Sequence, residues 1–451
     1  MSHWIRALRP FDMAASETQD NSLEELTGLL RSADLYGWEV RRVQETSDQL
    51  YLIFDQVESL RRVESLKYAV TLYLLVEKDG RPWLGESAWT ANPGDDFAAD
   101  LAQAREKAPL AVNPIFQLPG PEQPYQDLNL VDPILRNEPR QVLWQVRHDL
   151  NQAVSGAADI HLASAEVYAN YREIDIVNHK GLRGAYAQTE LQTQFALLAA
   201  VAGREAESLG WRRAGFYQDL HIGEMVRRYS RYARENVTAS LPPGGQYPVV
   251  FGEEALDALF NHLVAHAGGQ AAFQGWSRFT VGEPVINNPQ GDLLTLSSDP
   301  WLPGGVNSRP CDDRGLALHP VTFISENVFQ QPLADRRYAD YLSVQPTGGL
   351  TNLKVAPGRA TLAEILHTGT VLHLLRFSTL EPNPVTGAIS GEIRTGYLVR
   401  EGDAVPIKGG AISGHLDEAF RYVTLSRELE QRETYLGPAG VRFEEMHLAG
   451  A

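Results

Sequence analysis

The segment with the strongest bearing on the fold is IHLASAEVYANYREIDIVNHKGLRGAYAQTELQTQFALLAAV, residues 160–201. Apolar and polar side chains alternate along it, which is typical of antiparallel strands that bury one face. The tetrapeptide NHKG at 178–181 predicts the turn between two long strands. A second hairpin is predicted over residues 68–90, where Asp79-Gly80 is the strongest short hairpin signal.

Helices are predicted between these strands and after them. The first is expected over residues 21–38, where leucines recur at a period near 3.6 and Ser22 with Glu25 forms a plausible capping box. Further helices are predicted at 95–108, 140–154, 218–236, 361–366 and 415–426. Because strands and helices do not alternate regularly, the sequence predicts an α+β fold: an N-terminal domain of mixed helix and antiparallel sheet, then a β-rich C-terminal domain.

The segment LPPGGQYP at 241–248 is the best candidate for a domain boundary. We therefore expect an N-terminal α+β domain over residues 1–240 and a β-rich domain over residues 241–451. Within the first domain, residues 109–139 hold seven prolines and predict a linker or an irregular wrap.

Charge and composition narrow the class of function. The chain of 451 residues has a formal net charge of −17, which argues against a nucleic-acid partner because nucleic-acid grooves need a basic face. Its only cysteine, Cys311, excludes an intrachain disulfide and favours a reducing compartment. The first ten residues lack the apolar core of a signal peptide, and the longest apolar run is too short to span a bilayer. We expect a cytoplasmic protein without a membrane partner.

A pair of histidines lies within FGEEALDALFNHLVAHAGGQ, residues 251–270. His262 and His266 are four residues apart, so a helix places both imidazoles on one face, as in many zinc hydrolases. The next position after the first histidine usually carries the glutamate that activates water, but here it is Leu263. A leucine cannot accept a proton, so the general-base role is not filled.

The apolar positions of this helix form one stripe, with Leu263 in its middle and the two histidines at its edge; the stripe consists of Leu256, Leu259, Phe260, Leu263 and Ala267. A zinc site also needs a third protein ligand. Cys311 has no feature of a ligand, whereas Asp312 and Asp313 are possible oxygen ligands. The simplest interpretation is two histidines that border a core and bind no metal, with His262 and His266 kept as weak metal candidates.

Several segments of the C-terminal half resemble the TldD/PmbA family in content and order. They are PVVFGEEALDALFNHLV, NSRPCDDRGLALHPVTFISENVF, NPVTGAISGEIRTGYLVREGDAVPIKGGAISGHLDEAF and the final VRFEEMHLAGA. The similarity is clearest from about residue 248 to the end. It is looser before that, where KDGRPWLGESAWT and the hairpin around IDIVNHKG fit the expected order.

The resemblance implies a protease system of two kinds of chain. TldD-like chains carry His-Glu-x-x-x-His and a cysteine near the C-terminus as their zinc centre, whereas PmbA-like (TldE) chains lack it and pair with the active subunit. With the histidines aligned at a spacing of four, His262 and His266 match, Leu263 replaces the glutamate, and the cysteine is absent. Two of four centre residues are missing, so the chain resembles the PmbA branch. No cofactor is then expected in this chain, and zinc is expected in a TldD-like partner subunit.

Two other groups of polar residues are candidates for lining a substrate cavity. The first is Arg309, Asp312 and Asp313, for which a turn held by an Arg–Asp pair is the simpler explanation. The second lies in the hairpin turn shaped by Pro384 and Gly387, where turn chemistry again accounts for the residue types; it comprises Asn383, Thr386, Gly387 and Ser390.

Three functions remain open from the sequence. The first is a non-catalytic subunit of a heteromeric metallopeptidase that processes unfolded peptides, with a possible homodimer when the chain is alone. The second is a self-sufficient hydrolase whose altered centre uses His262, His266 and a carboxylate such as Asp312. The third is a regulatory binding protein without a protease role, since the family is also named for modulation of DNA gyrase; the acidic charge makes direct contact with DNA a poor fit.

Overall fold

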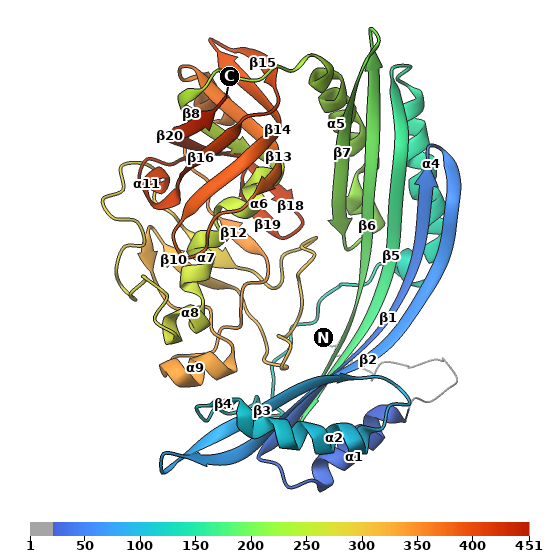
Figure 1. Ribbon diagram of the computed structural model, residues 1–451, viewed down its shortest axis with the longest axis vertical. Coiled ribbons are helices and arrows are strands. Elements are labelled where there is room, and N and C mark those ends of the chain that lie inside the picture. The colour runs from blue at the N-terminus through green and yellow to red at the C-terminus, as the bar shows by residue number, and fades with distance from the viewer. Residues whose placement is uncertain (1–20, 451) are drawn as a thin grey trace, which may run out of the picture.

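The computed structural model describes residues 21–450. A long antiparallel sheet with helices forms the N-terminal half, and a β-rich unit forms the C-terminal half (Figure 1). The α+β fold class is therefore confirmed. The first ten residues, on which the expectation about a signal peptide rests, lie outside the described residues. Within the described chain, no helix is both long enough and apolar enough to cross a membrane.

The N-terminal sheet is an antiparallel meander in which the strand order is β4-β3-β2-β1-β5-β6-β7. Both predicted hairpins are confirmed, with turns at Asp79-Gly80 and at 179–180. The strands are β1 Gly37–Ile53, β2 Gln56–Lys78, β3 Arg81–Ala91, β4 Val112–Asn113, β5 Ile160–Asn178, β6 Arg183–Val201 and β7 Arg204–Ala214.

Helices cover the two ends of this sheet. One pair, α4 and α5, packs on β5, β6 and β7, and the pair α1 and α2 covers the opposite end (Figure 1). The N-terminal helices are α1 Ser22–Ser32, α2 Phe97–Lys107, α3 Pro133–Asn137, α4 Pro139–Ser155 and α5 Ile222–Thr238, with short 3-10 turns η1 Ala108–Leu110 and η2 Tyr217–Leu220.

Two predicted helices are shorter than the sequence pattern suggests. The first ends at Ser32 because the chain turns extended at Ala33 and enters β1; the predicted capping box is wrong, since the N-cap is Asn21 and makes no side-chain cap bond. The helix predicted over 415–426 ends at Arg421, because residues 424–425 pair with the last strand. In both places strand pairing outcompetes a local helical pattern.

Strand β1 buries both of its faces. Its even-numbered residues Val40 and Leu50 lie in the cores beneath the helices. Its odd-numbered residues Glu39, Arg41 and Val43 point to the other face, where the C-terminal half packs. The sheet is therefore the layer that joins the helices to the C-terminal half.

The C-terminal half contains a closed ring of strands. The order β13-β8-β20-β16-β14 is completed by pairing of β14 with β13, and β15 extends β14. The strands are β8 Gly245–Gly252, β13 Val371–Leu380, β14 Ala388–Arg400, β15 Asp403–Ile407, β16 Ala411–His415 and β20 Gly440–Ala449.

A second, smaller sheet packs beside this ring around a shared apolar core. Its strands are β9 Leu296–Ser298, β10 Val321–Ser325, β11 Val328–Phe329, β12 Leu353–Val355, β18 Leu429–Arg432 and β19 Tyr435–Pro438, and β17 Thr424–Leu425 pairs with β20. The helices are η3 Glu253–Ala255, α6 Leu256–Leu259, α7 Asn261–Ala267, α8 Gly269–Phe273, α9 Arg336–Leu342, α10 Leu362–His367 and α11 Leu416–Arg421.

A buried polar contact, which we call the clasp, joins the N-terminal sheet to the C-terminal half. The Arg314 guanidinium lies 2.8 Å from the Glu39 carboxylate and donates to the Tyr73 hydroxyl at 2.7 Å, while that hydroxyl donates to Glu39 at 2.7 Å. The proline-rich segment 109–139 adds to this clasp, because the Tyr125 hydroxyl donates to the Gly315 carbonyl at 2.8 Å. An arginine bonded to both an acid and a phenol is a charge-assisted contact of the stronger kind.

Asp312 lies in the loop that carries Arg314, residues 309–316, which we call the clasp loop. Its side chain is buried, and the residue is 7 % exposed. Its Oδ1 accepts hydrogen bonds from the backbone N–H groups of Arg314 and Leu316, both at 2.9 Å, while its Oδ2 is buried with no hydrogen-bond partner within the described residues. Burial raises the pKa of Asp312 to about 6, against the lowering effect of those two backbone hydrogen bonds.

This raised pKa predicts a pH dependence of stability. The folded state holds the proton more tightly than the unfolded state, so the contribution of Asp312 is fully present below its unfolded pKa and is lost as the pH rises through about 6. The raised pKa corresponds to roughly 3 kcal/mol of stability that is present at low pH and absent at neutral pH. We expect Asp312→Asn to remove that loss, measured as the free energy of unfolding in urea from pH 4 to pH 7.5. The exposed Asp313→Asn is the matched control, and an unchanged pH profile in Asp312→Asn would contradict the prediction.

Candidate functional site

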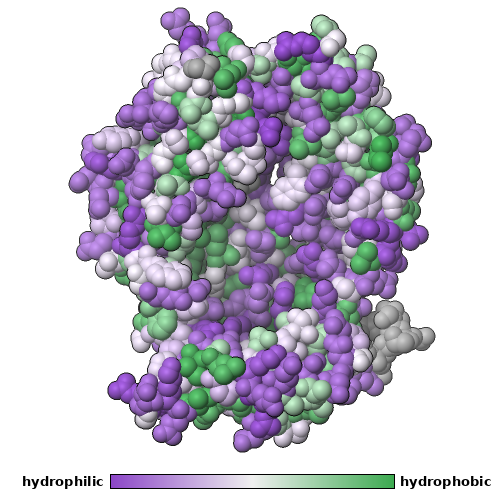
Figure 2. Space-filling model, viewed as in Figure 1, coloured by the Kyte–Doolittle hydropathy of each residue, from purple (hydrophilic) through white to green (hydrophobic). Residues whose placement is uncertain are grey.

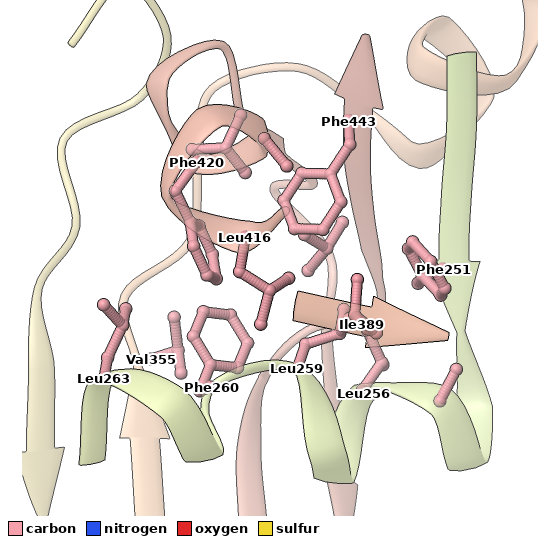
Figure 3. Close-up of a cluster of buried hydrophobic side chains, with 14 of the residues drawn as sticks. Phe251, Leu256, Leu259, Phe260, Leu263, Val355, Ile389, Leu416, Phe420 and Phe443 are labelled. Atoms are coloured by element: carbon pink, nitrogen blue, oxygen red, sulfur yellow. The ribbon is translucent and has the colours of Figure 1, made fainter. Parts of the chain in front are cut away.

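The helix predicted to carry the two histidines is divided into η3, α6, α7 and α8. Its apolar stripe is nevertheless buried as predicted: Leu256, Leu259, Phe260 and Leu263 are all 0 % exposed. Figure 3 shows these four side chains pointing to the same side, toward α11 and the strands that carry Ile389 and Phe443. The position where a hydrolase would carry its base therefore belongs to the core.

Both histidines lie on α7. They are more deeply buried than the sequence predicts, since it places them at the edge of the apolar stripe. His262 is 0 % exposed and His266 is 3 % exposed. Their ring centroids are 4.8 Å apart and the rings are nearly perpendicular, so the two imidazoles do form one cluster. The sequence pattern misjudged their burial because the turn between β13 and β14, far away in the sequence, covers them.

Carbonyl groups of that turn determine which ring nitrogens carry protons. His262 Nδ1 lies 3.1 Å from the Pro384 carbonyl, and His266 Nε2 lies 3.3 Å from the Val385 carbonyl. Since a carbonyl only accepts, both of these nitrogens are donors. His266 Nδ1 accepts from the Arg278 backbone N–H at 3.3 Å, which leaves neither nitrogen of His266 free.

The remaining nitrogen of the pair, His262 Nε2, faces an ion pair. The Arg278 Nη2 lies 2.7 Å from it, and the Asp417 Oδ1 lies 3.0 Å from it. Arg278 also bonds both oxygens of Asp417, at 2.7 and 3.1 Å. Burial alone would raise the pKa of Asp417, but its contacts with His262 and Arg278 outweigh this and hold the pKa well below its usual range.

The residues at this cluster do not fit the zinc ion that the resemblance associates with the family. A zinc site needs at least three donors, and His266 has both nitrogens engaged. The guanidinium of Arg278 already supplies positive charge between His262 Nε2 and Asp417, where a cation would bind. Across residues 21–450, no group of three or more His, Cys, Asp or Glu side chains is arranged to hold a metal ion.

Arg278 and Asp417 are the site residues that the sequence did not reveal. Asp417 lies in the first turn of helix α11, where the helix dipole favours an acidic residue. Its presence there is therefore explained without any role in a site. Arg278 follows α8 in an irregular segment without periodicity. They lie 139 residues apart in the chain, and only the packing of α11 against α7 brings them together.

The residues of the NPVTG turn are partly explained by the turn itself. Asn383 Oδ1 accepts from the backbone N–H groups of Val385 and Thr386, and Thr386 Oγ1 accepts from Ala388 N. Gly387 has φ +74°, and a Cβ there would lie 3.0 Å from His262 Nε2, so only glycine lets the turn close over the histidine. The turn therefore packs directly against the histidine pair.

The other sequence candidates lie elsewhere. Ser390 is exposed on β14 and pairs with Ser413 of β16. Arg309 lies 3.2 Å from Asp313, which also lies 3.6 Å from Arg41 of the N-terminal sheet. Asp312 is bonded within its own loop.

The clasp loop also contains the only cysteine. Burial raises the pKa of the Cys311 thiol to about 12, so it is not a ready thiolate ligand. Among residues 21–450, Asp312 and the two histidines do not gather into one group that could hold a metal ion.

A cleft of about 470 Å³ opens beside the cluster. Arg278 and Asp417 line this cleft, together with Phe279, residues 283–288, Glu418 and Arg421. The ion pair is therefore the part of the histidine cluster that a ligand in this cleft would meet.

Comparison with known proteins supports the resemblance. Residues 244–450 match the family model described as PmbA/TldA metallopeptidase C-terminal domain. The C-terminal half of this chain belongs to the TldD/PmbA family. The resemblance seen in the sequence is thereby confirmed over these residues.

Individual relatives are distant in sequence and similar in fold. The metalloprotease PmbA of Escherichia coli O157:H7 is 24 % identical over 288 residues, which are 60 % of this chain and 61 % of that protein's own length. The crystal structure of TldE from Thermococcus kodakarensis has a TM-score of 0.78 at 16 % identity and matches 96 % of this chain and 99 % of its own. A protein from Bacteroides thetaiotaomicron described as a modulator of DNA gyrase has a TM-score of 0.81 at 16 % identity, over 97 % of this chain and all of its own.

Leu263 offers a direct test of the core assignment. Leu263→Glu restores the missing base on paper, but it places a carboxylate at a fully buried position, so we expect a loss of a few kcal/mol in the free energy of unfolding. Leu263→Met, which conserves volume, should cost less than about 1.5 kcal/mol. Chemical denaturation monitored by circular dichroism measures both variants, and equal stability of Leu263→Glu and the parent would show that the position is open.

Arg278 offers a test of the metal assignment. We expect the unmodified protein to bind no zinc tightly, and Arg278→Ala to bind it at least roughly tenfold better, because removing one positive charge favours a divalent cation near His262 and Asp417. Zinc binding is measured by equilibrium dialysis with metal analysis. Arg278→Ala combined with His262→Ala should lose the gain. About one tightly bound zinc per unmodified chain would contradict the prediction.

Proposed function

We propose that this chain is a TldE-like, non-catalytic subunit of a heteromeric TldD/TldE-type zinc metallopeptidase. A TldD-like partner subunit would hold the zinc and cut the substrate. This chain would help to enclose an unfolded peptide that the complex degrades or processes. The absence of a nucleic-acid or membrane role and a location in the cytoplasm are part of the same proposal.

One observation carries the proposal: the histidine cluster is occupied by the protein's own groups. The base position is a core leucine, Leu263. The nitrogens of His266 are bonded to backbone, and His262 faces the guanidinium of Arg278. Water activation by a metal requires an open coordination position and a base, and this arrangement offers neither.

The retention of the fold supports assembly with an active chain. The same architecture extends over nearly the whole of a solved TldE structure, although only 16 % of residues are identical. A protein surface kept without catalytic chemistry is most simply explained by a partner that has the chemistry. The face drawn in Figure 2 is hollowed between the C-terminal half and the long sheet and is lined largely by hydrophilic residues, as an enclosure for an extended peptide would be.

A self-sufficient hydrolase is the second candidate, because a carboxylate does lie at the histidine pair. That carboxylate is Asp417, 3.0 Å from His262 Nε2, and not Asp312. This function would require Arg278 to leave its place between them. A regulatory binding protein without protease activity is the third candidate, and it follows only from the description of a structural neighbour.

The decisive experiment measures cleavage of an unstructured fluorogenic peptide by this chain, by a zinc-bearing TldD-like relative from the same source, and by their mixture. We expect no cleavage by this chain alone and cleavage by the mixture that a chelator abolishes. Chain carrying Arg278→Ala serves as the matched control for an activity hidden by the ion pair.

Each outcome separates the candidates. Chelator-sensitive cleavage by this chain alone would favour the altered hydrolase. A relative that is fully active alone, and that this chain neither binds nor accelerates, would refute the subunit proposal and leave the binding protein.

A further inference from the structure

The outer face of β13 carries a cavity that is separate from the cleft beside the histidine cluster. Strand β13 sends Leu372 and Leu374 into the core of the C-terminal half. Its alternate residues point to the other face: Val371 packs with residues of α10, and Leu375 packs in the apolar cluster that contains α5. His373 lies between these two residues. It lines, together with residues of α5 and α10, a cavity of about 470 Å³, which we call the β13 cavity.

His373 has an imidazole without a hydrogen-bond partner among the described residues. Its ring lies near Tyr397, with centroids 6.2 Å apart, and against Gly252, where a Cβ would lie 3.1 Å from Nε2. Burial, together with the charge of Arg231, lowers the pKa of His373 to about 4, so the ring is neutral at physiological pH. One ring nitrogen therefore donates and the other accepts, and both can serve a ligand in the cavity.

The other polar residues of the lining are mainly acidic. Three carboxylates, those of Glu235, Glu253 and Glu430, line the cavity together with one guanidinium, that of Arg231. This guanidinium is held against α5, because it donates to the Tyr232 hydroxyl at 3.4 Å and lies 5.1 Å from the centre of that ring. The lining therefore offers more hydrogen-bond acceptors than donors, which favours a ligand that donates.

Glu253 has the features of a residue held in place for a ligand. Its φ of +50° is in the left-handed region, and such backbone strain in a residue other than glycine is concentrated at binding sites. Its Oε1 accepts from the Tyr232 hydroxyl, and its Oε2 is buried with no hydrogen-bond partner among the described residues. Arg228 lies 3.6 Å from Oε1, but burial outweighs this contact and raises the pKa of Glu253. The positive charge around this carboxylate is therefore incomplete.

The other two carboxylates differ in how far they are satisfied. Glu235 accepts from the Tyr397 hydroxyl at 2.5 Å through Oε2, while its Oε1 has no hydrogen-bond partner within the described part of the chain. Glu430 is balanced by two arginines, Arg432 at 3.5 Å and Arg228 at 3.8 Å. Glu235 therefore provides a second accepting oxygen at the cavity, and Glu430 does not.

The side of the cavity formed by α10 is largely apolar. Helix α10 contributes Leu362 and Leu366, and β14 contributes Val399 beside them. Helix α10 also contributes His367, which is exposed. A cavity of this volume is in the usual range for small-molecule sites, which combine an apolar lining with a few polar groups. A ligand that fits both sides has an apolar body and a group that donates hydrogen bonds.

We propose that the β13 cavity binds a primary ammonium group on an apolar stem, the chemistry that a lysine side chain and a free alkylamine share. The ammonium meets the carboxylates of Glu235 and Glu253 and the accepting nitrogen of His373. The stem lies on Leu362 and Leu366. An ammonium has three donors and no acceptor, so it matches a lining in which acceptors are in excess. This inference does not depend on the proposed role in proteolysis.

Isothermal titration calorimetry of the full chain with hexylamine tests the proposal. Hexanol and hexanoate have the same apolar stem without the positive charge, and we expect both to bind at least roughly tenfold more weakly. Glu235→Gln should weaken hexylamine binding at least roughly tenfold and leave hexanol binding unchanged. The fold should survive, because the amide oxygen can still accept from Tyr397. Glu401→Gln is the matched control: it removes the same charge from an exposed turn outside the lining, so the affinity should not change.

A variant that fills the cavity supplies a second readout. Ala404 is exposed on β15 and lines the cavity, so Ala404→Phe should leave the fold intact and abolish binding of hexylamine. The ring signals of His373 in nuclear magnetic resonance spectra should shift on addition of hexylamine to the parent. They should stay in place when hexylamine is added to Ala404→Phe.

Two further probes separate the sources of the ammonium group. An unstructured peptide with one lysine and a blocked N-terminus is compared with the same peptide acetylated on that lysine. Binding of the first peptide alone would identify a lysine side chain as the ligand, and binding of hexylamine without the peptide would identify a free amine. The proposal is overturned if hexylamine binds no more tightly than hexanol, or if Glu235→Gln and Ala404→Phe both leave its binding unchanged.

Discussion

The architecture depends on one strand that buries both of its faces. Successive side chains of a strand point to opposite faces of the sheet. Strand β1 can therefore pack on both faces only if its even-numbered residues suit one neighbour and its odd-numbered residues suit the other. Val40 and Leu50 do so under the helices, and Glu39, Arg41 and Val43 do so toward the C-terminal half. A shift of the register by one residue would move Val40 and Leu50 out of the cores under the helices, and for that reason the pairing of β1 is tightly specified.

The contact between β1 and the C-terminal half is partly electrostatic. Arg314 is held by Glu39 and Tyr73 of the sheet, and the loop that carries it buries a carboxylate, Asp312, with one unpartnered oxygen. Buried charges are costly unless paired, and a pair that is broken leaves the other charge exposed to that cost. The contact therefore favours one relative placement of the two halves over others.

The histidine cluster illustrates how a metal-like constellation can be stable without a metal. Two turn carbonyls fix the proton positions on His262 and His266, and the guanidinium of Arg278 supplies the positive charge beside Asp417. Each polar atom of the pair has a protein partner, so nothing in the site requires an ion for its satisfaction. A bound peptide in the neighbouring cleft would meet the Arg278–Asp417 pair and not the imidazoles.

Elements with a periodic, local signal could be predicted from the sequence. The alternation over residues 160–201, the Asp79-Gly80 turn and the buried stripe around Leu263 all follow from a single segment, and the structure has them. The blocks of the C-terminal half were also sufficient to identify the family. Local signals failed where pairing with a distant segment competed, as at the end of the first helix and after Arg421.

The surroundings of the histidines and the extent of strand pairing in the long sheet could not be predicted from the sequence. Arg278 and Asp417 are 139 residues apart, and nothing in either local sequence points to the other. Residues 56–67 have the sequence of an ordinary strand, and only the pairing shows that β3 reaches no further along β2 than Tyr68, opposite Ala91. The physical reason is the same in both cases: local sequence encodes backbone preference and the side that is buried, whereas partners are chosen by packing between segments that the chain brings together only on folding.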